Sequence, residues 1–338
     1  MVGEPVNLPA KIDTLSALRL LSLISKAAET RNVVLNFARQ PVLEPFGMLL
    51  LSCLGRTLRA SGVKFQLQNV DKYSYAAHIG FLEQFDESYC SIGNGARGND
   101  RYIVIRAITR AELNAEAIAA NIAYMGDAID KFATRLAKLL TQSDEGGVLV
   151  NALTHCLREI IRNSYEHSGS DEILVCAQYR QTANRVDLAF ADSGVGVLRT
   201  LRRNRGVSVE SHTDALKVAL MPGISGTLTT RWDDSNPWAN SGYGLFMTHR
   251  ICREGGVFSI CSGDSLLSIS GGQFIERQMP EVGTVVGISV VLDQLMKLNK
   301  SGLNDLAAEG SEIRKALKGK IVTPKMAATI LSNGQENK

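Results

Sequence analysis

One stretch of the chain, residues 153–168, constrains the fold more than any other because two patterns coincide in it. Apolar residues recur at helical spacing and form one stripe, made of Leu153, Leu157, Ile160 and Ile161. Glu159, Asn163 and His167 follow at intervals of four and line up on one face of the same helix. A carboxylate, an amide and an imidazole so placed could hold a hydrated metal ion and a phosphate, although a solvated polar face has the same spacing.

A second motif follows a strand-like run at residues 186–191. It consists of Asp192, Gly194 and Gly196. A carboxylate at the end of a strand, followed by alternating glycines, suits the binding of an amine on a flat ring with the backbone close behind it. This motif predicts one end of a ligand site.

A third motif, Gly242-x-Gly244-Leu245, opens a helix-like run at residues 245–252. Glycines at a helix start leave backbone N–H groups free for phosphate oxygens. A strand-like segment at residues 283–291 then begins with Gly283 and Thr284. A dinucleotide-binding motif of the Rossmann type fits less well, because a third glycine and a preceding strand are missing.

The order of these motifs resembles that of the GHKL ATPases, the superfamily of DNA gyrase, MutL, histidine kinases and anti-sigma-factor kinases. The resemblance covers roughly residues 147–292 and rests on Glu159-x-x-x-Asn163, Asp192-x-Gly194-x-Gly196, Gly242-x-Gly244-Leu245 and Gly283-Thr284. The chain departs from the family at Ser164, where an alanine is usual, and at Asn240, where a glycine is usual.

The resemblance implies a Bergerat α/β sandwich that binds ATP and Mg²⁺. By analogy, Glu159 is the catalytic residue that polarises the attacking water or hydroxyl, Asn163 ligates Mg²⁺, and Asp192 binds the adenine amine. The residues implied to contact the nucleotide are Asn163, His167, Asp192, Gly194, Gly196, Gly242, Gly244, Leu245 and Thr284. The family's ATP lid corresponds to residues 197–241, with Ser225, Thr227, Thr230 and Arg231 as candidate phosphate donors.

The N-terminal region predicts a βαβ unit with a parallel sheet: a strand at 33–37, a helix at 47–60 and a strand at 63–69. Residues 30–106, including a returning strand at 101–106, resemble a STAS domain, the fold of anti-sigma-factor antagonists. That family often carries a phosphorylatable hydroxyl where this chain has Phe46. We therefore expect no phosphorylation there and a docking platform for a protein partner instead.

We predict two α/β domains. Residues 1–110 form the STAS-like domain, 111–146 a helical linker, 147–295 the GHKL domain, and 296–338 a helical and flexible tail. The long helical stretch at 111–140 could connect the domains or pair with a second copy, so a homodimer is possible.

Composition excludes several other classes of protein. The 338 residues are 45% hydrophobic and 21% charged, as in ordinary globular proteins, and no apolar run approaches a membrane span. A net charge of +3 is too small to indicate nucleic acid, and the start shows no secretion signal. The six cysteines form no Cys-x-x-Cys pair, which favours buried thiols in a reducing cytoplasm. We expect a cytoplasmic protein.

The predicted function is an ATP-binding signalling or regulatory protein, either a Mg²⁺-dependent ATPase or a protein serine/threonine kinase of the anti-sigma, partner-switching type. A histidine autokinase fits poorly because residues 107–146 contain no histidine. A gyrase- or MutL-type protein fits poorly because the residues after Val291 are too few for a transducer domain. The alternative is a non-catalytic, ATP-gated interaction module with a STAS-like docking domain.

Overall fold

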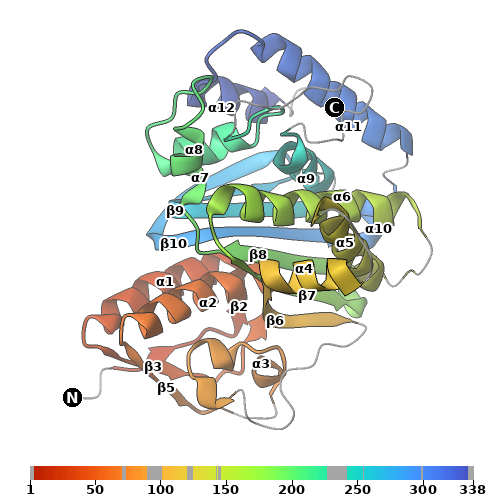
Figure 1. Ribbon diagram of the computed structural model, residues 1–338. Helices are drawn as coiled ribbons and strands as arrows, with labels where there is room; N and C mark the ends of the chain where they lie inside the picture. The colour runs from red at the N-terminus through yellow and green to blue at the C-terminus, as the bar shows by residue number, and fades with distance from the viewer. Residues whose placement is uncertain are drawn as a thin grey trace.

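The computed structural model describes residues 4–70, 74–89, 101–119, 125–141, 143, 146–226, 242–253, 255–297 and 300–333. These residues form a mixed α/β fold, which confirms the predicted class in its broad form. Figure 1 shows the N-terminal elements on one side of a large antiparallel sheet, with α6 and its neighbouring helices on the other. Among the described helices, none is long and apolar enough to cross a membrane.

The N-terminal part contains the βαβ unit that the sequence predicts. A three-stranded parallel sheet has the order β1 (Val6–Asn7), β3 (Asn32–Asn36), β5 (Lys64–Gln68). Two shorter strands, β2 (Lys11–Ile12) and β4 (Val42–Leu43), pair beside it. The helices of this part are α1 (Thr14–Ala28), α2 (Pro45–Ala60) and α3 (Tyr75–His78), followed by the short turns η1 (Leu82–Gln84) and η2 (Glu87–Tyr89).

Helix α2 is buried around most of its circumference. Residues 45–52 are buried without interruption, which is expected of a helix enclosed on all sides. It packs against α1 and, on its other side, against β7, β8 and β10 of the large sheet. Phe46 lies against that sheet so closely that a Cβ at Gly287 would be 2.9 Å from the Phe46 Cβ. The N-terminal part and the large sheet therefore share one apolar core.

Polar contacts also join α2 and its surroundings to the large sheet. The Arg180 guanidinium lies 3.1 Å from the Glu44 carboxylate, and the Gln178 amide donates to the Leu43 carbonyl at 2.7 Å. Arg56 of α2 pairs with Glu172 at 2.5 Å. The face of α2 that carries Phe46 is thus occupied by the sheet of the same chain.

The large sheet has five strands in the order β6-β7-β8-β10-β9, all antiparallel. Their bounds are β6 (Tyr102–Thr109), β7 (Glu172–Arg180), β8 (Arg185–Asp192), β9 (Gly256–Ser270) and β10 (Gln273–Val291), with a turn η4 (Gln181–Ala183) between β7 and β8. The strand expected at 101–106 exists as β6, but it pairs with β7 and not with the N-terminal sheet. Sequence periodicity reveals a strand without revealing its partner.

Helices cover the second face of the large sheet. They are α4 (Arg110–Ala119), α5 (Met125–Thr141), α6 (Val148–Asn163) with the π-helical turn η3 (Ser164–Ser168), α7 (Gly196–Leu201), α8 (His212–Ala219), α9 (Gly244–Arg253) and α10 (Leu292–Met296). The stretch predicted as a linker supplies α4 and α5, and α5 packs along α6.

The C-terminal segment is also helical in its described part, with α11 (Lys300–Leu317) and α12 (Pro324–Asn333). Helix α11 packs on α9, and α12 packs on α8. Between them, the Val322 carbonyl accepts a hydrogen bond from the Ser208 N–H at 2.9 Å. The helical part of the predicted tail is thus built into the fold, above α8 and α9 in Figure 1.

Candidate functional site

Helix α6 places the first predicted motif. Its apolar stripe, formed by Leu153, Leu157, Ile160 and Ile161, is buried as the spacing predicts. Glu159 is buried. Asn163, the last residue of the helix, is half-buried. His167 belongs to η3, but its side chain lies outside the described residues.

Glu159 lies directly against the first residue of α9. A Cβ at Gly244 would overlap the Glu159 Cβ and would come 2.8 Å from its Oε2. On the other side, Arg158 Nη2 is 3.3 Å and Arg162 Nη1 is 3.9 Å from the Glu159 Oε1. The two guanidinium groups compensate the charge of the buried carboxylate, and the glycine lets α9 begin beside it.

Asp192 ends β8, and in the strand register it pairs with Thr284 of β10. The Gly194 N–H donates to the Asp192 Oδ1 at 3.0 Å. Burial raises the pKa of Asp192, while this hydrogen bond and others from the Ser164 and Ser168 side chains act in the opposite direction. The carboxylate is therefore fixed in a largely desolvated position.

Gly194 brings the second motif against the end of α6. A Cβ at this position would overlap the side chain and carbonyl of Ser168, and the next N–H, that of Val195, donates to the Ser168 carbonyl at 2.8 Å. Gly196 has a φ of +79°, a conformation that favours glycine. The chain between β8 and α7 is thus held against η3 by contacts that larger residues would prevent.

Ser262 connects this turn to the final Gly-Thr motif. Its hydroxyl accepts a hydrogen bond from the Val197 N–H at 2.9 Å and lies 3.2 Å from the Thr284 Oγ1. A Cβ at Gly283 would overlap the Asp192 carbonyl. Thr284 is therefore close to both the Asp192 and the Gly196 segments.

The third motif forms a tight turn before α9. Gly242 has a φ of +69°, and its carbonyl accepts a hydrogen bond from the Gly223 N–H at 3.1 Å. Leu245 is half-buried against the main core, so it packs the helix in place. Of the candidate donors in the predicted lid, Ser225 is described, while Thr227, Thr230 and Arg231 lie outside the described residues.

The structure therefore gathers the predicted motifs around the end of α6. Glu159 meets Gly244, and the Ser164–Ser168 turn meets Asp192 and Gly194. In the sequence Ser164 stands out only as a departure from the family, and no role was predicted for Ser168 or Ser262. The two serines of η3 stand four residues apart directly after Asn163, and this spacing was the available signal.

A magnesium ion at this site would have few protein ligands. Among the described residues, no three His, Cys, Asp or Glu side chains gather as metal ligands. Mg²⁺ does not need such a cage, because it commonly keeps several waters and takes one or two protein oxygens together with phosphates. The carboxamide of Asn163, one helical turn after Glu159, can supply such an oxygen.

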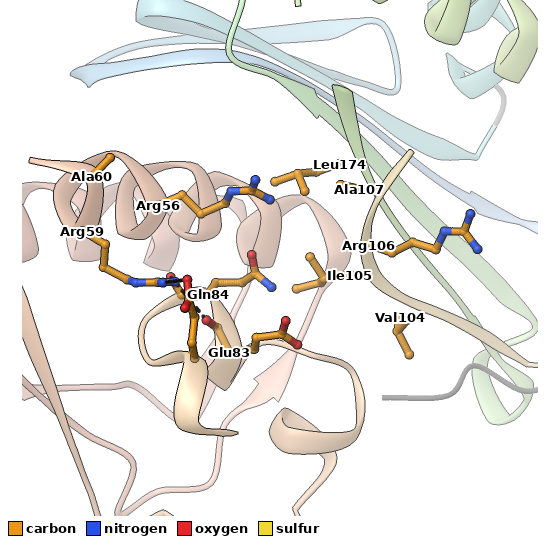
Figure 2. A pocket seen from close by; sticks show the side chains of 11 residues that line it. Arg56, Arg59, Ala60, Glu83, Gln84, Val104, Ile105, Arg106, Ala107 and Leu174 are labelled. Atoms are coloured by element: carbon orange, nitrogen blue, oxygen red, sulfur yellow. Dashed lines mark hydrogen bonds and ion pairs between the residues drawn. The ribbon is translucent and has the colours of Figure 1, made fainter. Parts of the chain in front are cut away.

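A hollow of about 770 Å³ lies elsewhere, between the N-terminal part and β6 (Figure 2). Arg56 and Arg59 line it from α2, and Arg106 lines it from β6. Arg56 pairs with Glu172, and Arg59 pairs with Glu87. None of the predicted nucleotide-binding residues lines this hollow, and its two ion pairs join α2 to β7 and to η2.

Comparisons with models of protein families, with curated proteins and with solved structures found no match to the chain.

Proposed function

We propose that this chain is an ATP-binding protein of the GHKL type, with a STAS-like N-terminal unit, that uses Mg²⁺ to hydrolyse ATP or to transfer its terminal phosphoryl group to a protein serine or threonine. One observation carries the proposal. Motifs at 159–163, 192–196 and 242–245, far apart in sequence, meet around the end of α6 through the Glu159–Gly244 and Ser168–Gly194 contacts.

Asp192 provides the adenine end of the proposed site. Its carboxylate is buried, oriented by the Gly194 N–H at 3.0 Å, and flanked by the Ser164 and Ser168 hydroxyls. A fixed acceptor in a desolvated position favours a ligand that donates a hydrogen bond, as the adenine amine does.

The start of α9 provides the phosphate end. Helix α9 spans Gly244–Arg253, and the backbone N–H groups of its first turn have no partners within the helix. Such groups and the helix dipole favour phosphate oxygens. Asn163 would ligate the magnesium ion that neutralises phosphate charge. Thr284, which pairs with Asp192 in the strand register, would be a further donor at the adenine end.

Glu159 is the proposed catalytic residue. Its carboxylate borders the first residue of α9, which places it next to the phosphate end. A carboxylate there can accept a hydrogen bond and a proton from an attacking water or serine hydroxyl. The guanidinium groups of Arg158 and Arg162 stabilise the negative charge of this carboxylate and help to orient it.

The same two arginines support the second candidate function, a non-catalytic ATP-gated module. A buried carboxylate that is already engaged by guanidinium groups can serve as structural support for the start of α9. ATP would then bind without turnover and change how the chain engages a protein partner. Because α2 is covered by the large sheet, such a partner would use another surface of the STAS-like unit.

Calorimetric titration of ATP into the protein, with Mg²⁺ and with EDTA, tests the proposal. We expect ATP to bind in both conditions and more tightly with Mg²⁺. GTP tests the role of Asp192, because guanine presents a carbonyl where adenine presents the amine, and it should bind more weakly. Phosphate release and phosphotransfer assays then separate the two candidate functions. Absence of ATP binding in both conditions would refute both of them.

A further inference from the structure

The turn before α9 is covered by α11, a helix of the C-terminal segment. Tyr243, Phe246 and Met247 form a buried cluster, and Leu306 and Ile313 of α11 pack against it. The Tyr243 and Phe246 rings meet edge to face with their centroids 6.0 Å apart. The Tyr243 side chain, between the motif residues Gly242 and Gly244, therefore packs toward α11.

A glycine in α11 makes this contact possible. A Cβ at Gly310 would lie 2.7 Å from Cε1 of Tyr243 and 2.7 Å from Cε1 of Phe246. Both rings are rigid and nearly fully buried, so neither can move aside easily. Gly310 weakens the helix locally, and the close approach of the two rings accounts for its presence.

An ion pair with a buried arginine joins the same two helices next to this cluster. Arg250 of α9 lies 2.7 Å from the Glu309 carboxylate, and the Arg250 side chain is only 4% exposed. The Arg250 guanidinium also lies over the Phe246 ring, 5.2 Å from its centroid. These contacts fix how α9 and α11 lie against each other.

Arg314 of α11 contacts the segment around Gly223, which is hydrogen-bonded to the turn at Gly242. Its Cδ and Nε would lie 2.9 Å from a Cβ at Gly223, whose N–H donates to the Gly242 carbonyl. Burial raises the pKa of Tyr243, and the nearby Ser311 and Arg314 side chains act in the opposite direction. Helix α11 thus contacts both segments that pair at Gly223 and Gly242.

We infer that α11 positions the Gly242–Gly244 turn for phosphate binding, with Gly310 and Arg314 as positioning residues that act through Tyr243 and Gly223. The inference rests on the proposed ATP function of the turn. It assigns to the C-terminal segment a part in the nucleotide site, although none of its described residues belongs to the predicted motifs.

Two variants test the inference. Gly310→Leu should push α11 away from Tyr243 and Phe246. Arg314→Gln is milder, and Arg314→Lys should restore part of its effect. Hydrogen exchange of the 243–250 amides is measured in nucleotide-free protein, and ATP affinity is measured well below each melting temperature. We expect faster exchange in 243–250 and a loss of ATP affinity of about tenfold or more, the effect of a small misplacement.

The matched control is Leu331→Ala. Leu331 is a core residue of α12, a helix of the same C-terminal segment that packs on α8. This variant should lower the melting temperature, yet leave ATP affinity within about twofold and exchange in 243–250 unchanged.

Unchanged exchange at 243–250 in both Gly310→Leu and Arg314→Gln would overturn the inference. Wild-type protein that binds ATP, together with variants that bind it equally well, would also overturn it and leave the proposed function intact. Faster exchange in the variants, but no ATP binding by the wild type, would leave the positioning of the turn established and refute the proposed function.

Discussion

Gly244 and Glu159 lie in direct contact, with the Glu159 Oε2 2.8 Å from the point where a Cβ on residue 244 would be. The contact joins the first and third motifs, which are separated by about eighty residues of sequence. It makes glycine at 244 a requirement of packing between α6 and α9, independent of any ligand.

Gly244→Ala should therefore destabilise the protein by about 1–3 kcal/mol, the usual cost of overpacking. It should also displace the start of α9 and weaken ATP binding. Urea unfolding and ATP titration measure the two effects. Gly126→Ala is the control, because nothing lies within 4 Å of a Cβ there and α5 should gain up to about 1 kcal/mol. If the two variants had the same stability and the same ATP affinity, the contact between Gly244 and Glu159 would not matter for either.

Asp192→Asn should weaken ATP binding by about 1.5–3 kcal/mol, because a charged acceptor for the amine is lost. Calorimetry measures this loss. GTP affinity, which should change less, serves as the reference ligand. An ATP affinity equal to that of the wild type would place Asp192 outside the ligand site.

The same variant should change how stability depends on pH. Burial raises the pKa of Asp192 above 3.8, its ordinary value, so the folded state binds the proton more tightly. Stability from this group is complete below the ordinary value and is lost as pH rises through the folded pKa. Asparagine does not titrate, so the melting temperature of Asp192→Asn relative to wild type should increase as the pH rises from below the ordinary value through the folded pKa. A difference that is constant with pH would contradict this reading.

Phe46→Ala should destabilise the chain by about 3–5 kcal/mol, the range for a buried phenylalanine. Because Phe46 packs on Gly287, the loss should affect the N-terminal sheet and the large sheet together. Hydrogen exchange in urea should show β3 and β10 losing protection at the same denaturant concentration. Val42→Ala, at a position 54% exposed, is the control. Separate transitions for the two strands would show independent domains.

Local patterns predicted much of the fold. The apolar stripe of α6, the βαβ unit at 33–69 and the helix after Gly244 follow from spacing and glycine placement, and the structure contains each of them. The partner of β6 could not be predicted, because alternation of apolar residues specifies a face and not a neighbouring strand. The run Met48–Leu51, apolar on every side, was the signal that α2 is enclosed.

The motif residues of the candidate site could be predicted from the sequence, but the residues that pack around them could not. Glu159, Asp192 and Gly244 were found from the motif order. The serine neighbours of Asp192 and the covering of the turn by Gly310 depend on contacts between segments distant in sequence. The spacing of Ser164 and Ser168 could mark them as a pair on one helical face, but only the assembled structure reveals that they lie against Asp192.

The most direct measurement compares Glu159→Gln with Asn163→Ala in ATP affinity, with Mg²⁺ and with EDTA, and in ATP turnover. Glutamine keeps the packing against Gly244 but cannot accept the proton. Glu159→Gln should bind Mg·ATP nearly as wild type does, while turnover falls roughly 10²–10⁴-fold. Asn163→Ala should lose the Mg²⁺-dependent part of ATP binding as well as turnover. Two variants that match the wild type in affinity and turnover would contradict the account.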